Sequence, residues 1–131
     1  MYLMPTNLRR ALFVLTTVLA ALTLSACGGD GLPVELTAQG AEGREIANAS
    51  GCASCHGKNG QGVTAPTWQG LYGGPRELQD GTIVTADDEY LYNSIVDPQA
   101  QIAKDYTIKM PQNDLTDDQI ELVITYIREL G

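Results

Sequence analysis

The residues best suited to chemistry in this chain lie in one short segment that contains Cys52, Cys55 and His56. Two thiols at this spacing can add to the two vinyl groups of one porphyrin, and the imidazole beside the second thiol then lies under the iron as the proximal ligand. The sequence Cys-x-x-Cys-His is for this reason the attachment pattern of c-type haem. We therefore predict one covalent haem c, with Cys52 and Cys55 as thioether links and His56 as an axial ligand of the iron.

Zinc binding and thiol redox chemistry are the alternatives for such a cysteine pair. A zinc site needs two further ligands, but His56 is the only histidine and the one remaining cysteine, Cys27, is expected to carry a lipid. A thioredoxin-like pair follows a strand inside a βαβ pattern, and neither is visible around this segment. Haem attachment is therefore the favoured interpretation.

The composition also limits which residue can be the second axial ligand of the iron. A single histidine excludes ligation by two histidines of one chain, and Met1 and Met4 fall in the N-terminal signal, which leaves Met110 as the only other thioether. We predict that Met110 binds the iron opposite His56; a methionine that is only packed in the core or lies on the surface is the alternative. A histidine and methionine pair holds the iron six-coordinate and favours the ferrous state, which suits an electron carrier better than a peroxidase or an oxygen-binding protein.

The elements that must position these residues are predicted to be helices. The last one, 116–130, begins with a capping box of Thr116 and Gln119 and repeats apolar residues at helical spacing. A shorter helix should open with Thr85 and Asp88 and end near Val96, before an Asp-Pro pair. Together with a first helix, these predict an all-α domain with three main helices.

The first helix is expected to run from Thr37 to Ser50, and a small hairpin should turn at Asp80-Gly81. The apolar core is modest, because Trp68 is the only tryptophan and the one phenylalanine, Phe13, lies in the signal. The haem is expected to supply the missing core, so that its loss should unfold the domain.

The N-terminal segment predicts export. Arg9 and Arg10 precede an apolar run over 11–24, which is shorter than the roughly 20 residues that span a bilayer. The run ends at Leu24-Ser25-Ala26-Cys27, which resembles the bacterial lipobox, where the chain is cut before the cysteine and its sulfur is acylated. An uncleaved anchor, or an ordinary signal with a chance cysteine, is the alternative.

The chain is thus expected to consist of a cleaved lipoprotein signal peptide over 1–26, a lipidated flexible tether over 27–40 and a domain over 41–131. Loss of the signal leaves 6 basic and 16 acidic residues, a net charge of −10. Such an acidic domain disfavours nucleic acid, since phosphate binding needs a basic surface. We expect it on the membrane outside the cytoplasm, on the periplasmic side or on the outer face of the cytoplasmic membrane.

The chain resembles the class I cytochrome c family over about residues 40 to 130. The likeness rests on the haem motif and, as supporting segments, on 65–73, 84–91, 94–98, Met110-Pro111 and the final helix with Tyr126. It is most similar to the cytochrome c domain fused to subunit II of some bacterial haem-copper oxidases. The upstream residues do not resemble the copper domain or helical hairpin of that subunit, so a free-standing carrier is expected. The implied fold is all-α, with loops wrapped round one haem and a small hairpin insertion.

Further residues are assigned to the haem site as candidates. The resemblance implies that the Pro66 carbonyl accepts a hydrogen bond from the proximal imidazole. Trp68, Tyr72 and Arg76 are candidates for binding the haem propionates, with ordinary packing as the alternative. The family often has an aromatic residue where this chain has Ala47, so another side chain, Tyr126, is expected to fill the contact between the first and last helices.

The expected function is transfer of single electrons by a membrane-tethered monohaem cytochrome c, from a quinol-oxidising complex to a terminal haem-copper oxidase. No catalytic residue is expected and the protein is a carrier, not an enzyme, since no bond in a substrate changes. A bound electron-transfer subunit of a periplasmic dehydrogenase or reductase is the alternative, and a haem-based ligand sensor is a third. We expect a monomer, whose Lys58, Lys104 and Lys109 either form a basic docking rim or are simply solvated.

Overall fold

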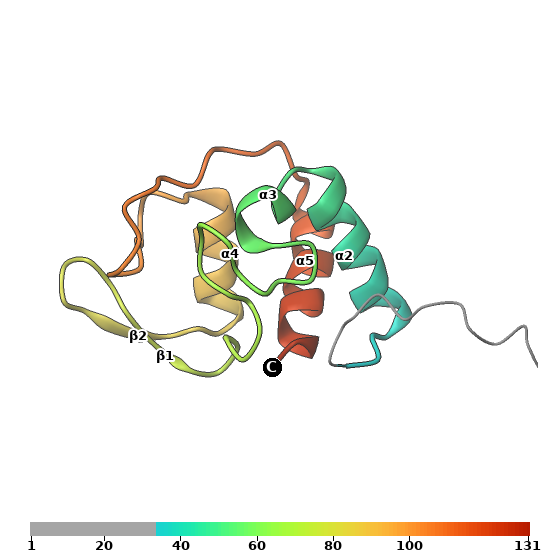
Figure 1. The fold of residues 1–131 in the computed structure, drawn as a ribbon, viewed down its shortest axis with the longest axis horizontal. Coiled ribbons are helices and arrows are strands. Elements are labelled where there is room, and N and C mark those ends of the chain that lie inside the picture. Colours follow the sequence, from blue (N-terminus) through green and yellow to red (C-terminus); the bar gives the residue numbers. More distant parts are fainter. Residues whose placement is uncertain (1–33) are drawn as a thin grey trace, which may run out of the picture. The chain divides into compact units, whose positions relative to one another are not determined.

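The computed structural model describes residues 34–131, so the predictions for the signal peptide and for Cys27 lie outside the described residues. Its elements follow in the order α2 (Ala38–Ala49), α3 (Ala53–His56), β1 (Pro75–Glu77), β2 (Ile83–Thr85), α4 (Asp88–Val96) and α5 (Asp117–Glu129) (Figure 1). This mostly helical architecture with one small hairpin confirms the predicted fold class. None of the helices in the described residues has the length and apolar character needed to cross a membrane.

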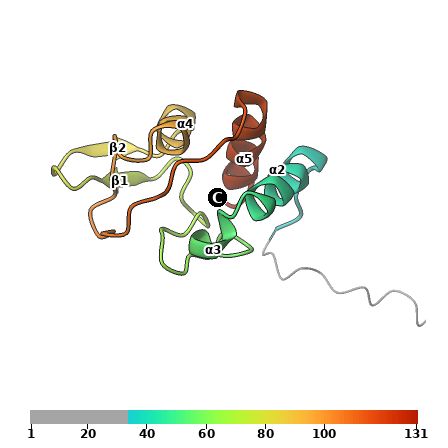
Figure 2. The same cartoon turned by 90° about the horizontal axis from the view of Figure 1, so that it is seen from above.

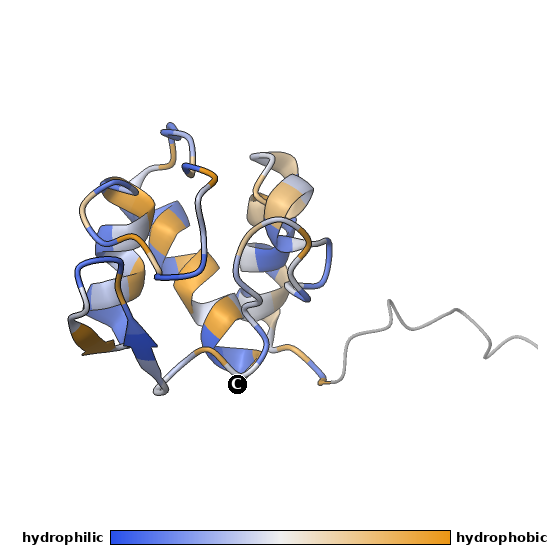
Figure 3. Ribbon diagram, turned by 60° about the vertical axis from the view of Figure 1, so that its left-hand side comes forward, coloured by the Kyte–Doolittle hydropathy of each residue, from blue (hydrophilic) through white to orange (hydrophobic). Residues whose placement is uncertain are grey.

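Helix α5 lies between α2 and α4 and is the centre of the fold (Figures 1 and 2). The predicted capping box is present, because the Gln119 amide donates to the Thr116 hydroxyl and the Thr116 amide donates to the Gln119 side chain. One face is buried, and it consists of Ile120, Val123, Ile124, Tyr126 and Ile127. Each fully buried aliphatic side chain contributes about 1.5–3 kcal/mol, so this amphipathic face fixes the helix in the core (Figure 3).

Helix α2 packs closely against α5. At Gly43 a β-carbon would overlap the Leu122 carbonyl oxygen of α5 and lie 3.1 Å from Tyr126 Cβ. The buried Tyr126 thus lies at this crossing. Thr37 caps α2, and its amide also donates to Glu129 Oε2 over 2.9 Å, which joins the start of α2 to the end of α5. The helix begins at Ala38, so residues 38–40 at the end of the predicted tether range are helical.

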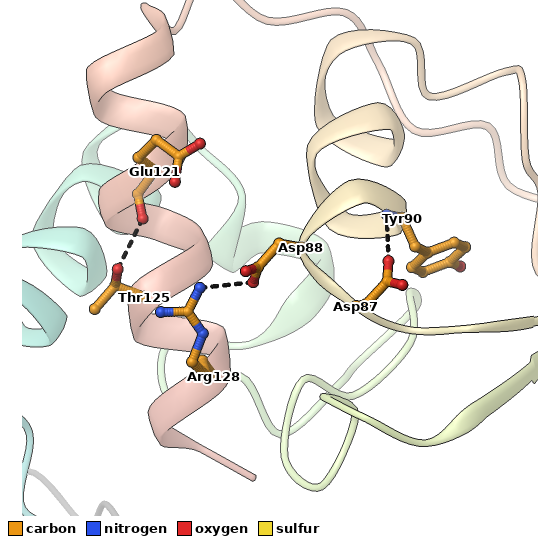
Figure 4. A network of polar contacts seen from close by, with 6 residues as sticks. All are labelled: Asp87, Asp88, Tyr90, Glu121, Thr125 and Arg128. Carbon is orange, nitrogen blue, oxygen red and sulfur yellow. Dashed lines mark hydrogen bonds and ion pairs between the residues drawn. The ribbon is translucent and has the colours of Figure 1, made fainter.

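Helix α4 is capped by Asp87 and not by Thr85, so the predicted start was wrong. The Asp87 carboxylate accepts from the Tyr90 amide over 3.0 Å (Figure 4). Thr85 is instead the last residue of β2, where it pairs with Pro75, so the chain is still part of the hairpin at the position predicted to cap the helix. The end at Val96, with Asp97 as the C-cap, agrees with the prediction.

The predicted hairpin is confirmed, with Arg76 opposite Val84 in an antiparallel pair of strands. Gly81 has φ 85°, a left-handed conformation that glycine adopts at little cost, and it closes the turn beside Asp80. A bridge from Leu78 to Ala103 then joins the hairpin to the long loop that connects α4 to α5. The hairpin therefore supports one side of that loop.

An ion pair joins α4 to α5 on the surface. Arg128 Nη2 donates to Asp88 Oδ1 over 2.6 Å (Figure 4), and the Arg128 guanidinium lies 5.3 Å from the centre of the Tyr72 ring. Both charged groups are exposed, so the pair contributes at most about 1 kcal/mol. The Tyr72 ring therefore lies beside this ion pair.

Candidate cofactor site

A cavity of about 330 Å³ lies among α3, α4, α5 and the loops that follow α3 and α4. This volume falls in the range of small-molecule and cofactor sites, about 300–1,000 Å³. The cavity brings together most of the predicted site residues, namely Cys52, Cys55, His56, Pro66, Trp68, Arg76 and Met110. Tyr72 does not line it, since its ring faces Arg128 at the ion pair between α4 and α5. Tyr72 is therefore not placed to bind a ligand of this cavity.

Helix α3 presents the two thiols and the imidazole from a single helical turn. Cys52 is its N-cap and His56 its last residue, and the His56 amide donates to the Cys52 carbonyl over 3.0 Å. Residues three apart on a helix lie on the same side, so Cys52 and Cys55 both line the cavity. Gly57, with φ 86°, ends the helix directly after His56 in a conformation that other residues rarely adopt.

The loop after α3 folds back over the end of this helix. The Cys55 carbonyl accepts from the amides of Val63, Thr64 and Ala65 over 3.0 to 3.1 Å, and the His56 carbonyl accepts from Gly62 over 2.7 Å. These bonds satisfy carbonyl groups that a helix end would otherwise leave unpaired. They also fix the position of the next residue along the chain, Pro66.

The Pro66 carbonyl oxygen lies 2.9 Å from His56 Nδ1, the contact that the family resemblance implies. A carbonyl only accepts, so Nδ1 carries the proton and Nε2 keeps a free lone pair for a metal. Burial lowers the pKa of His56, and the hydrogen bond to Pro66 opposes part of this shift. The imidazole is therefore neutral at neutral pH, the form that binds metals.

Trp68 stacks on the His56 ring, with 4.5 Å between the ring centroids and 20° between the planes. The Trp68 ring also packs edge to face on Tyr126 of α5, with 6.0 Å between the ring centroids. The indole therefore ties the imidazole to the helical core and limits rotation of the ring. This packing agrees with the alternative given for Trp68 from the sequence, and the stacking partner, His56, is set by the fold.

The two thiols have different acidities in the unmodified chain. Burial raises the pKa of the Cys52 thiol, whereas the hydroxyls of Thr64 and then Ser54 lower the pKa of the Cys55 thiol. Both cysteines are free and half-buried. The thiol of Cys55 therefore has the lower pKa of the two and forms the thiolate more readily before any covalent attachment.

The cavity also carries polar atoms that lack a partner. Arg76 Nε, Ser94 Oγ and Gln101 Oε1 are buried, make no hydrogen bond among the described residues, and belong to residues that line the cavity. Buried polar groups are normally paired, so these three indicate a ligand with polar groups of its own. The guanidinium of Arg76 is suited to a carboxylate. The sequence did not indicate Ser94 and Gln101 as site residues, because the fold brings them to the cavity.

The residues present therefore fit a haem c. Two thiols match its vinyl groups, a neutral imidazole and a half-buried thioether match its iron, and Arg76 matches its propionates. Apolar side chains of α4 and α5 also line the cavity, among them Leu91, Ile95, Val123 and Ile127. Within residues 34–131, no group of three or more His, Cys, Asp or Glu side chains is placed to share a metal ion.

The three lysines of the predicted basic rim are placed differently. Only Lys109 lines the cavity. Lys104 Nζ pairs with Glu77 Oε1 over 2.6 Å, and this carboxylate raises the Lys104 pKa. Lys58 is exposed and does not line the cavity.

Comparison with known proteins gives a family for this chain. The model of the family described as cytochrome c matches residues 40–131. This range includes α2 from its third residue onward, every later helix and strand, and all residues that line the cavity. No curated protein matches the chain.

Proposed function

The chain belongs to the cytochrome c family, and from this premise we propose that it carries single electrons between a quinol-oxidising complex and a terminal haem-copper oxidase while tethered to a membrane. Membership of the family makes it an electron carrier with redox partners and not an enzyme, and its cofactor is a covalently attached haem c. Cytochromes c of bacteria typically work outside the cytoplasm. The two partner complexes, the membrane tether and the residues that bind the haem iron are what we propose.

The observation that carries the proposal is that His56 and Met110 line one cavity together with both cysteine thiols. Cys52 and Cys55 would hold the haem as thioethers, and His56 Nε2 and the Met110 sulfur would bind its iron. When bound, the haem supplies one reversible step between ferric and ferrous iron. With His56 and Met110 both holding the iron, the chain would leave no ligand place open for a substrate, as a pure electron carrier requires.

The remaining side chains of the cavity support this role through their environment. Apolar residues of α4 and α5, such as Leu91 and Val123, exclude water from the cavity, and Arg76 offers a positive charge to the propionates. Low polarity and a thioether ligand both favour ferrous iron, which suits a carrier that delivers electrons to an oxidase. The exposed Lys109 is available to guide a negatively charged surface of a partner.

The membrane tether rests on the sequence alone. Acylation at Cys27 would hold the domain close to the membrane, where quinol-oxidising complexes and terminal oxidases lie. Replacing Cys27→Ser in the full chain is expected to move the protein from the membrane fraction to the soluble fraction with an unchanged haem spectrum. Retention of the variant in the membrane fraction would contradict lipid anchoring at this cysteine.

The ligand set is tested by spectroscopy of the purified holoprotein. The unmodified protein should show the weak near-infrared band of ferric iron bound to thioether sulfur, and acid acetone should not extract the haem. Met110→Ala should lose the band and bind carbon monoxide at neutral pH without denaturant. Extraction of the haem, or an unchanged band in the variant, would refute the proposed site.

The partners are tested by electron transfer and by purification. Reduced protein should be oxidised by membranes that contain a haem-copper oxidase, and oxidised protein should be reduced by membranes supplied with quinol. Stable copurification with a dehydrogenase or reductase, with no oxidation by such membranes, would instead support the bound-subunit alternative.

A further inference from the structure

We propose that Gln99 is a positioning residue for Met110, because its side-chain amide holds the loop that carries this sulfur. The inference rests on the proposed function, in which Met110 binds the iron. Gln99 Nε2 donates to the Met110 carbonyl oxygen over 3.0 Å. The importance of this bond follows from how the rest of the loop between α4 and α5 is held.

The first half of this loop is fixed to the hairpin by several contacts. They are the bridge from Leu78 to Ala103, backbone bonds from Gln79 to Ile102 and from Lys104 to Glu77, the Lys104–Glu77 ion pair, and a bond of 2.8 Å from Gln79 Nε2 to the Tyr106 carbonyl. Loss of any single contact leaves the others in place. This half is therefore held redundantly.

The second half of the loop, residues 107–112, is held differently. Among the hydrogen bonds of the described residues, the bond from Gln99 to the Met110 carbonyl is the one that joins this stretch to the rest of the fold. The loop is fixed again only at Asn113, whose Nδ2 donates to the Ile95 carbonyl over 2.8 Å. Met110 therefore lies in a stretch that one side-chain hydrogen bond joins to the rest of the described fold.

Gln99 is well placed to hold that stretch, because it is itself anchored to α4. It lies in the turn that follows this helix, where the carbonyl of the C-cap Asp97 accepts from the Ala100 amide over 3.0 Å. Helix α4 also lines the cavity, through Ser94 and Ile95. Through Gln99, the backbone of Met110 is thus tied to the helix that forms a wall of the proposed haem site.

The test measures how easily an added ligand displaces the Met110 sulfur from the iron. Purified ferric holoprotein is titrated with imidazole, and the Gln99→Ala variant is compared with the unmodified protein and with Gln79→Ala. The control removes the same kind of amide-to-carbonyl bond from the same loop, but in its redundantly held half. Gln99→Glu is a second variant that keeps the side-chain size and removes the donor.

We expect Gln99→Ala and Gln99→Glu to raise the apparent affinity for imidazole about fivefold, which corresponds to about 1 kcal/mol for one hydrogen bond. Gln79→Ala should leave the affinity within about a factor of two of the unmodified protein.

An equal affinity in all four proteins, with the near-infrared thioether band present in each, overturns the inference and leaves the proposed function intact. Absence of the band from the unmodified protein would instead refute Met110 ligation itself. If Gln99→Ala yields no holoprotein, the result for Gln99→Glu decides.

Discussion

The close packing of α2 on α5 predicts that Gly43→Ala destabilises the holoprotein strongly. A β-carbon at this position would overlap the Leu122 carbonyl oxygen and lie 2.6 Å from the Leu122 carbonyl carbon. Both are backbone atoms of α5, so neither can turn away as a side-chain end would. The two helices must move apart, and the buried residues at their crossing, such as Ala47 and Tyr126, lose contact.

Gly40→Ala in the same helix is the matched control. The three atoms nearest to a β-carbon there all belong to the Glu129 carboxylate, the end of a flexible side chain. Alanine gains about 0.5–1 kcal/mol over glycine inside a helix at either position. At Gly40 this gain offsets the weakening of the exposed bonds between Glu129 and Thr37, each worth about 0.5–1.5 kcal/mol, so the net change should be small.

At Gly43 the gain is outweighed. Overpacking costs about 1–3 kcal/mol even where side chains can adjust, and an overlap with backbone belongs at the upper end of this range. We expect a net loss of about 2 kcal/mol, which lowers the melting temperature of a domain of this size by about 8–16 °C. Urea unfolding, followed by haem absorbance and by far-ultraviolet circular dichroism, measures this difference. Equal stability of Gly43→Ala and Gly40→Ala would refute the argument from backbone overlap.

Three further substitutions test other contacts. Asp88→Asn should lower the free energy of unfolding at neutral pH by about 0.2–1 kcal/mol, because it removes the exposed ion pair with Arg128. The bond from Arg128 lowers the Asp88 pKa, so this contribution is present above the pKa of Asp88 in the unfolded chain and is lost as the pH falls through its pKa in the folded protein. Urea unfolding in acid should therefore show no difference between the variant and the unmodified protein. Arg76→Leu should lower the midpoint potential by about 20–40 mV, since a positive charge beside the propionates favours ferrous iron; redox titration showing no shift would contradict this role. Trp68→Leu should lower stability by about 2–3 kcal/mol through lost stacking on His56, with thermal unfolding as the measure and an unchanged melting temperature as the contrary result.

The sequence was sufficient to predict those features that depend on local pattern. The cysteine pair with His56 needs only one helical turn to present its groups, and the capping box at Thr116 depends on residues three apart. The turn at Asp80-Gly81 is likewise set by residues that are neighbours in the chain. In each of these features the residues that interact are close in sequence, so their types and spacing define the geometry.

Features that depend on distant parts of the chain could not be predicted in this way. Thr85 resembles a helix cap in sequence, but it is paired with Pro75 across the hairpin. Tyr72 is near Arg76 in sequence, yet it faces Arg128 of the last helix and not the cavity. Ser94 and Gln101 gain a role only through the cavity that the fold encloses. No local pattern distinguishes such positions from ordinary surface or core residues.

The core and the cofactor site of this protein share the same side chains. Leu91, Ile95, Val123 and Ile127 belong to the buried cluster and also line the cavity, so a bound haem would complete the core that these residues begin. A ligand that binds only the folded state stabilises it, and a covalently attached one does so without dissociating. The double variant Cys52→Ala and Cys55→Ala, expressed without attached haem, should therefore lose its cooperative thermal transition, whereas the holoprotein should keep one. A cooperative transition at the same temperature in both proteins would show that the polypeptide forms its core alone.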